Sequence, residues 1–146
     1  MTKELWINLP VKDVNRSKAF FTSLGFSFNP QYSNGEDGAC LIVGERNVAV
    51  MLFKETAFEG FAGTNVADVK QGTEVLFSID AESPEEVDAL ARKVVEAGGT
   101  IYGEPGYKDG WMYGCGFIDP DGHRWSVLHM DMERMPRQQK QDAEQV

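Results

Sequence analysis

The strongest constraint on the fold is an order of predicted elements that occurs twice along the chain. Hydrophobic periodicity predicts one strand, one helix and three further strands in residues 4–53, and the same order again in residues 73–131. The two halves share little sequence identity, so the repeat is argued from the order of elements and not from matching residues. The pattern predicts an α+β domain that is built from two βαβββ modules.

The first module has recognisable helix signals. A strand is expected at residues 4–9, with Leu5 on the face that turns to the core and Pro10 helping to end it. Asp13 is placed to cap the following helix, and Gly25 can supply a left-handed stop. Three further strands are then predicted, at residues 26–32, 39–43 and 48–53.

The second module repeats these signals after a connector. Its first strand is expected at residues 74–79, and Ser83, Pro84 and Glu86 form a capping box with proline at the first helical position. An Asp-Pro-Asp-Gly turn at residues 119–122 joins the last two strands. The remaining strands are predicted at residues 100–102, 112–118 and 124–130.

The segments outside the modules are polar or aperiodic. Residues 54–72 contain three glycines and no clear periodicity, so we interpret them as a connector with one helical turn. Residues 133–146 have one proline, four glutamines and balanced charges, which is typical of a flexible polar tail. Residues 1–132 are therefore expected to form a single domain.

The charge balance excludes one class of partner. Asp and Glu number 23 against 14 Lys and Arg, which gives a net charge of −9. Nucleic-acid binding needs clustered basic residues, so no nucleic-acid partner is expected. A cationic ligand would be attracted to this surface, although plain solubility explains the same charge.

Cysteine usage and hydropathy indicate a compartment. Cys40 and Cys115 have no second cysteine or histidine at zinc-finger or redox spacing, so we expect free thiols in a reducing cytosol. We find no apolar run with the length of a signal peptide or a membrane span. The sequence therefore predicts a cytoplasmic protein with no membrane partner.

Two stretches resemble a known superfamily. Residues 9–14, followed by Arg16, Ser17 and the run up to Phe26, are similar to the opening strand and helix of the vicinal oxygen chelate superfamily, and residues 117–124 are similar to its final hairpin. The resemblance covers residues 4–131 and is greatest to the branch labelled predicted lactoylglutathione lyases. It implies the glyoxalase/bleomycin resistance/dioxygenase fold, in which two modules form a curved mixed sheet around a small-molecule cleft.

The resemblance also implies four metal-ligand positions, which this chain fills poorly. Catalytic members hold one divalent metal with His, Gln or Glu from the first and last strands of each module, and the matching positions here are Trp6, Met51, Glu74 and Ser126. Glu74 alone is a good ligand for a hard cation, whereas a catalytic site usually needs three. His123 lies in the turn, and His129 has the opposite strand parity from Ser126. We therefore expect no metal and no other cofactor.

Strand parity predicts which side chains face the cleft. The inward set is Trp6, Asn8, Met51, Phe53, Glu74, Leu76, Ser78 and Ser126. This set suits a small organic ligand with an aromatic or cationic part, unless the side chains simply fill the cavity. A carboxylate that faces an apolar cleft costs free energy unless it is paired, hydrated or used, so Glu74 is also a candidate general base.

Three functions remain open from the sequence. The first is binding and sequestration of a small, cationic compound, as bleomycin-resistance relatives do. The second is a metal-dependent lyase or dioxygenase that resembles lactoylglutathione lyase, and the third is metal-free chemistry with Glu74 as the base. Because the resemblance implies twofold pairing, we expect a homodimer, with the modules packed within one chain or exchanged between chains.

Overall fold

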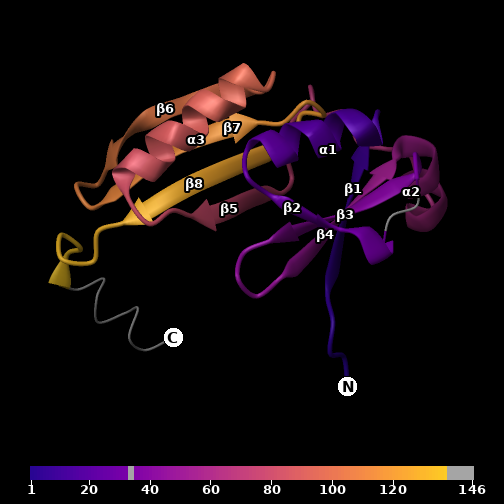
Figure 1. Ribbon diagram of the computed structural model, residues 1–146, viewed down its shortest axis with the longest axis horizontal. Coiled ribbons are helices and arrows are strands. Elements are labelled where there is room, and N and C mark those ends of the chain that lie inside the picture. The colour runs from indigo at the N-terminus through magenta and orange to yellow at the C-terminus, as the bar shows by residue number, and fades with distance from the viewer. Residues whose placement is uncertain (33–34, 138–146) are drawn as a thin grey trace.

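The computed structural model describes residues 1–32 and 35–137 and arranges their strands in two four-stranded mixed sheets (Figure 1). The first sheet has the order β1-β4-β3-β2 and contains β1 (Trp6–Val11), β2 (Ser27–Asn29), β3 (Gly38–Val43) and β4 (Val48–Lys54). The second has the order β5-β8-β7-β6 and contains β5 (Leu76–Asp80), β6 (Thr100–Lys108), β7 (Met112–Ile118) and β8 (Arg124–Met130). The predicted α+β fold of two βαβββ modules is confirmed.

Both modules have the same internal pairing. The first and last strands of each module, β1 with β4 and β5 with β8, run parallel, and the other neighbours are antiparallel. Helix α1 (Val14–Ser23) covers one face of the first sheet, and helix α3 (Pro84–Glu96) covers one face of the second. We call these the helix-side faces and the opposite faces the open faces.

The helix signals in the sequence are confirmed. The Asp13 side chain accepts a hydrogen bond from the backbone N–H of Arg16 at 3.2 Å, which caps α1. Ser83 caps α3 in the same way through the N–H of Glu86 at 3.1 Å. Gly25 follows α1 with a φ of 99°, a left-handed conformation that favours glycine.

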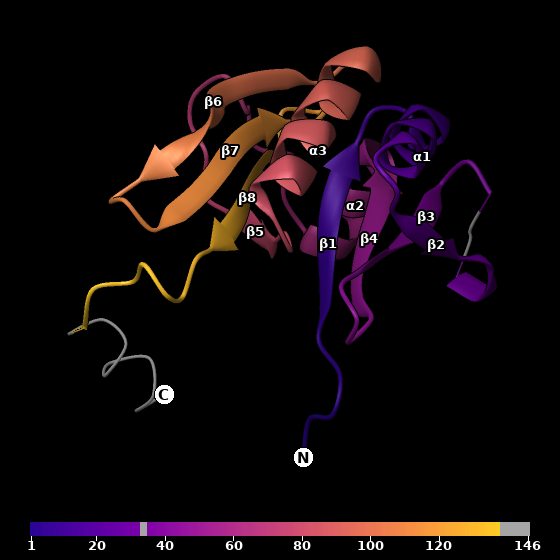
Figure 2. The ribbon, with the colours of Figure 1, turned by 60° about the vertical axis from the view of Figure 1, so that its left-hand side comes forward.

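The two modules meet through their helix-side faces (Figure 2). The ring of Phe21 on α1 lies 5.3 Å from that of Trp125 on β8, and Phe20 lies 6.2 Å from Phe117 on β7. These rings are buried, and they join the cores of the modules into one hydrophobic cluster. The open faces of the two sheets are left free of this contact.

A polar contact fixes the modules at one end. The Asp121 carboxylate, in the turn before β8, accepts hydrogen bonds from the backbone N–H of Lys12 at 2.8 Å, from Arg16 at 3.0 Å and from the hydroxyl of Ser17 at 3.0 Å. The side chain of Asp121 is only 4% exposed, so the carboxylate has lost its hydration. These hydrogen bonds compensate for that loss. The predicted Asp-Pro-Asp-Gly turn therefore ties the second module to α1.

Buried polar contacts also shape the turn itself. Asp119 is 5% exposed and accepts hydrogen bonds from the backbone N–H groups of Asp121 and His123 and from Nε1 of Trp125. Burial raises the pKa of this carboxyl group, against the lowering effect of these donors. Hydrogen bonds to Asp119 within the turn and from Trp125 therefore stabilise the turn, in addition to the contacts that Asp121 makes with α1.

Several sequence-based boundaries are wrong. Strand β1 runs from Trp6 through Pro10 to Val11, because an edge strand tolerates proline, and Leu5 before it is 75% exposed instead of facing the core. The connector contains a two-turn helix, α2 (Glu55–Ala62), and not a single turn. Strand β6 extends to Lys108 through register shifts that simple alternation does not reveal.

Two further expectations concern the ends of the chain and the membrane. Most of the predicted polar tail, residues 138–146, lies outside the described residues. Across residues 1–32 and 35–137, none of the helices has the length and hydropathy to cross a membrane.

Candidate functional site

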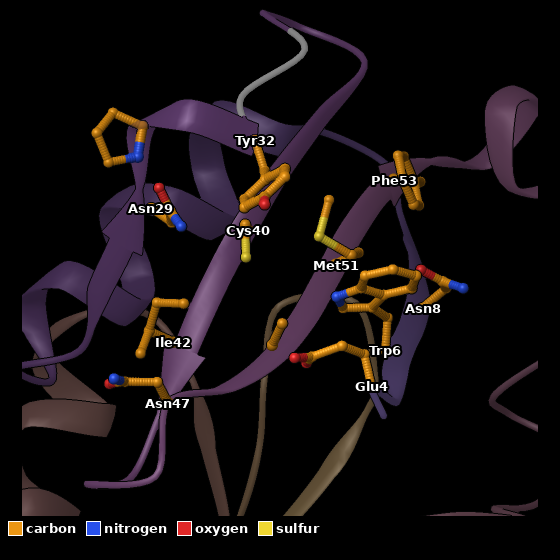
Figure 3. A pocket seen from close by; sticks show the side chains of 12 residues that line it. Glu4, Trp6, Asn8, Asn29, Tyr32, Cys40, Ile42, Asn47, Met51 and Phe53 are labelled. Atoms are coloured by element: carbon orange, nitrogen blue, oxygen red, sulfur yellow. The ribbon is translucent and has the colours of Figure 1, made fainter. Parts of the chain in front are cut away.

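The open face of the first sheet carries a hollow of about 820 Å³ (Figure 3). Residues from β1, from β3 and β4, and from the segment around β2 line it: Glu4, Trp6, Asn8, Asn29, Pro30, Tyr32, Cys40, Ile42, Asn47, Ala49, Met51 and Phe53. Its volume is in the range of small-molecule sites in proteins. The strand register explains why residues from different strands line the hollow together. Asn8 and Cys40 both lie opposite Met51 and therefore share its face of the sheet.

Aromatic rings form much of the wall. Trp6 is 59% exposed, and in Figure 3 its indole lies beside Met51 and Asn8, with Phe53 further along β4. Phe53 is held from two sides: the ring of Phe61 on α2 packs edge-on at 5.0 Å, and Gly38 lies beneath. A Cβ atom on Gly38 would come within 3.0 Å of Cε1 of Phe53, so glycine makes room for this ring.

The floor of the hollow contains sulfur. Cys40 is 1% exposed and has a free thiol, and Met51 lies directly opposite on β4. Burial raises the pKa of the Cys40 thiol, so the thiol stays protonated and unreactive at neutral pH. The floor is therefore soft and apolar, and it contributes no charge.

Among the described residues that line the hollow, Glu4 is the single acidic side chain. It lies at the end of the hollow near Trp6, and no lysine, arginine or histidine is found among these described residues. Asn8, Asn29 and Asn47 supply neutral donors and acceptors. The hollow combines aromatic faces with a single negative charge, an arrangement that favours a cation with an apolar part.

The structure divides the eight sequence-predicted cleft residues between the two sheets. Trp6, Asn8, Met51 and Phe53 line the hollow of the first sheet. The other four belong to the second module, where Leu76 and Ser78 lie on β5, Ser126 lies on β8, and Glu74 precedes β5. Within one chain, only the first four of these residues line the hollow.

The position of Glu74 differs from the prediction. The sequence pattern placed it in a strand that faces an apolar cleft, but strand β5 begins at Leu76 and Glu74 is an exposed residue in the preceding bend. Hydration stabilises an exposed carboxylate, so the free-energy argument for Glu74 as a base does not apply within one chain, and its role as a base stays a prediction.

The donor set does not fit a divalent metal. Of the four implied ligand positions, Trp6 and Met51 offer no hard donor, Ser126 offers a neutral hydroxyl and Glu74 is exposed on the other module. Across residues 1–32 and 35–137, we find no group of three His, Cys, Asp or Glu side chains placed to hold a metal ion. No catalytic step through a metal is derived for this chain.

Both histidines bind backbone carbonyl groups instead. Nε2 of His123 lies 2.7 Å from the carbonyl oxygen of Pro10, and Nδ1 of His129 lies 3.0 Å from that of Ala81. A carbonyl oxygen can only accept, so each of these nitrogens donates. The predicted orientation of His129, away from the open face, agrees with its bond to Ala81.

Sequence reasoning missed Tyr32, Cys40 and Glu4 in the hollow. Cys40 reaches it because β3 pairs with β4 in a register that places Cys40 opposite Met51, and that register is not visible in the sequence. Tyr32 lies in a 3₁₀ turn, Pro30–Tyr32, where the sequence predicted the end of a strand. Glu4 has the parity of Trp6, so the same alternation could have identified it.

Comparison with known proteins identifies the family. The family model of the Glyoxalase/Bleomycin resistance protein/Dioxygenase superfamily matches residues 5–127. Among solved structures, the hypothetical protein SA1046 from S. aureus is 32% identical to this chain with a TM-score of 0.78, and the match covers 88% of this chain and 94% of that one. No curated protein matches the chain.

More distant solved structures share the fold alone. A glyoxalase/bleomycin resistance protein/dioxygenase family enzyme from Burkholderia phytofirmans PsJN is 19% identical with a TM-score of 0.74, covering 86% of this chain and 96% of that one. Lactoylglutathione lyase from Agrobacterium tumefaciens is 15% identical with a TM-score of 0.61, covering 88% and 94%. The chain therefore belongs to the Glyoxalase/Bleomycin resistance protein/Dioxygenase superfamily.

Proposed function

We propose that this chain binds and sequesters a small organic cation with an apolar part, in the hollow of the first sheet. The observation that carries the proposal is the lining of that hollow, where Trp6, Tyr32 and Phe53 supply aromatic faces and Glu4 supplies the single charge. Aromatic faces attract ammonium groups through the ring quadrupole, and a nearby carboxylate adds to the attraction. The net charge of −9 favours the approach of such a ligand.

We further propose that a second copy of the chain closes the hollow. The open faces of both sheets expose large side chains, with Trp6 at 59% on the first sheet and Leu76 at 53% and Tyr102 at 44% on the second. A twofold dimer that places the second sheet of one chain over the hollow of the other would cover these side chains. It would also bring the predicted cleft residues of the first sheet in one chain together with those of the second module in the other chain. The first group is Trp6, Asn8, Met51 and Phe53, and the second is Glu74, Leu76, Ser78 and Ser126.

Calorimetric titration with benzyltrimethylammonium tests the ligand class, with benzyl alcohol as the uncharged analogue. The proposal expects the ammonium compound to bind more tightly, and Trp6→Leu to weaken its binding about tenfold, because a desolvated cation–π contact contributes about 1–2 kcal/mol. Glu4→Gln should have a smaller effect. Tyr107→Leu, which removes an equally exposed ring on β6, should not change binding. Equal binding of the two compounds, or an unaltered affinity in Trp6→Leu, would overturn the proposal.

Light scattering and subunit mixing test the role of the second copy. Leu76→Asp should give a folded monomer, because a carboxylate in the contact between two open faces would lose its hydration. Ammonium binding should weaken because the hollow then loses the second copy that covers it. A mixture of Trp6→Leu and Leu76→Asp chains should regain binding, since each heterodimer then contains one intact cleft. A parent protein that is monomeric at concentrations where it binds the ligand fully would rule out a shared cleft.

A further inference from the structure

The open face of the second sheet carries a cation in an unusual setting. Arg124, at the start of β8, is half-buried, whereas the chain's other arginines, Arg16, Arg46, Arg92, Arg134 and Arg137, are all exposed. The aliphatic part of an arginine can be buried while its guanidinium stays in contact with water, so the contacts of the guanidinium itself decide what it can bind.

The guanidinium group is held over an aromatic ring. Its Cζ atom lies 4.7 Å from the ring centroid of Tyr102 on β6, and the Tyr102 hydroxyl donates to the carbonyl oxygen of Trp125 at 3.4 Å. Gly116 on β7 lets the ring lie against the sheet, because a Cβ atom there would come within 2.7 Å of Oη of Tyr102. The stack leaves the edge of the guanidinium, with its N–H donors, free for a planar acceptor.

A hydroxyl group accompanies the guanidinium on the same face. Ser126 follows Arg124 by two residues on β8, so both side chains point away from the helices. Ser126 is also the register partner of Gly116, the residue against which the Tyr102 ring lies. Ser78 on β5 lies on the opposite side of β8 from this ring and is not part of the group.

Among the described residues, no carboxylate forms an ion pair with Arg124. Within residues 1–32 and 35–137, the single ion pair found is that of Arg16 with Asp121. Asp80 lies opposite Leu128, two register pairs beyond Ser126, and Glu74 lies in the exposed bend before β5. Within this part of the chain, the guanidinium donors of Arg124 are therefore available to a ligand.

We propose that Arg124, together with Tyr102 and Ser126, binds the carboxylate group of a small organic anion. A guanidinium group matches a carboxylate through two parallel N–H···O bonds, and the Ser126 hydroxyl can donate to a remaining lone pair. The residues of this site belong to one chain and to a different sheet from the hollow. In the proposed dimer this face would lie over the hollow of the other copy, so the carboxylate and the cation would occupy opposite walls of one cleft.

Titration with benzoate, followed by the NMR signals of the backbone amides and of the Arg Nε–H groups, tests this site, with benzyl alcohol as the uncharged analogue. Benzoate should shift the Arg124 Nε–H signal and the amide signal of Ser126, and benzyl alcohol should not. Arg124→Gln should weaken binding at least tenfold, and Gly116→Ala should weaken it by displacing Tyr102. Arg124→Lys, which keeps the charge but loses the planar donor pair, should fall between the parent and Arg124→Gln.

The matched control is Arg134, whose Cζ atom lies 4.8 Å from the ring centroid of Tyr107 in the same module but which is exposed. Arg134→Gln should bind benzoate as the parent does. Trp6→Leu should also leave benzoate binding unchanged, which separates this proposal from the one on the hollow. Equal weakening by Arg124→Gln and Arg134→Gln, or parent benzoate shifts that leave out Arg124 and Ser126, would overturn the assignment.

Discussion

The helix-side and open faces of the sheets each contain a tryptophan, one buried and one exposed. Trp125 on the helix-side face is 1% exposed, packs its ring 4.9 Å from Phe77 and donates from Nε1 to Asp119 at 3.2 Å. Trp6 on the open face is 59% exposed and lines a hollow. Apolar burial supplies most of the folding free energy, so Trp125 stabilises the fold while Trp6 contributes little to it. The difference supports the proposal that the open face binds a ligand and a second copy.

The largest expected effect compares these two tryptophans directly. Trp125→Ala should lower the free energy of unfolding by about 3–5 kcal/mol, because it leaves a cavity between the modules and an unpaired acceptor on Asp119. Trp6→Ala should lower it by less than about 1 kcal/mol. Urea unfolding followed by circular dichroism measures both values. Comparable losses in the two variants would break the distinction between the faces.

The next effect concerns the polar contact that joins the modules on the helix side. Asp121→Ala should cost about 3 kcal/mol, because it leaves the N–H of Lys12 and the hydroxyl of Ser17 without their acceptor and removes the ion pair to Arg16. Asp13→Ala, which removes only the cap of α1, should cost about 1 kcal/mol in the same urea experiment. A loss for Asp121→Ala no greater than that for Asp13→Ala would mean that the modules hold together without this contact.

A smaller effect tests how tightly the hollow is built. Gly38→Ala should destabilise the protein by about 1–2 kcal/mol, because the new methyl group meets the Phe53 ring. Gly60→Ala on α2 meets nothing within 4 Å and should stabilise the helix by about 0.5–1 kcal/mol. Thermal unfolding of the two variants should therefore shift in opposite directions. Shifts of the same sign would contradict the described position of Phe53.

The smallest effect concerns pH on the helix-side face of the second sheet. The hydrogen bond from Tyr113 to Asp88, at 2.6 Å, raises the pKa of Tyr113 to about 12 from its ordinary value of 10.0. The folded-state pKa is the higher one, so the contribution of this bond is complete below pH 10.0 and is lost as the pH rises towards 12. Tyr113→Phe should remove that part of the alkaline destabilisation, measured by urea unfolding at stepped pH. An identical alkaline profile in the variant would contradict the bond.

Local signals predicted the fold well. The caps at Asp13 and Ser83, the stop at Gly25 and the turn before β8 depend on neighbouring residues, and the structure confirms all of them. Helix α2 was underestimated because it is short, contains Gly60 and begins after Lys54, whose side chain makes no capping hydrogen bond.

The site was harder to predict because it depends on register and on module packing. Alternation placed Trp6 and Met51 correctly on one face, but Cys40 enters the hollow through the pairing of β3 with β4. Glu74 was assigned to a strand that begins two residues later, and a carboxylate in a bend is hydrated. The sequence could not show that one chain keeps its two open faces apart, since that follows from the aromatic contacts between the modules.

The most direct test of the account uses the indole N–H signals of the chain's three tryptophans. Trp6 lines the open hollow, whereas Trp111 and Trp125 are 6% and 1% exposed. Addition of benzyltrimethylammonium should shift the Trp6 indole signal progressively to saturation and leave the other two in place. A Trp6 signal that does not move, or a Trp125 signal that moves with the same affinity, would contradict the assignment of the open face to ligand binding.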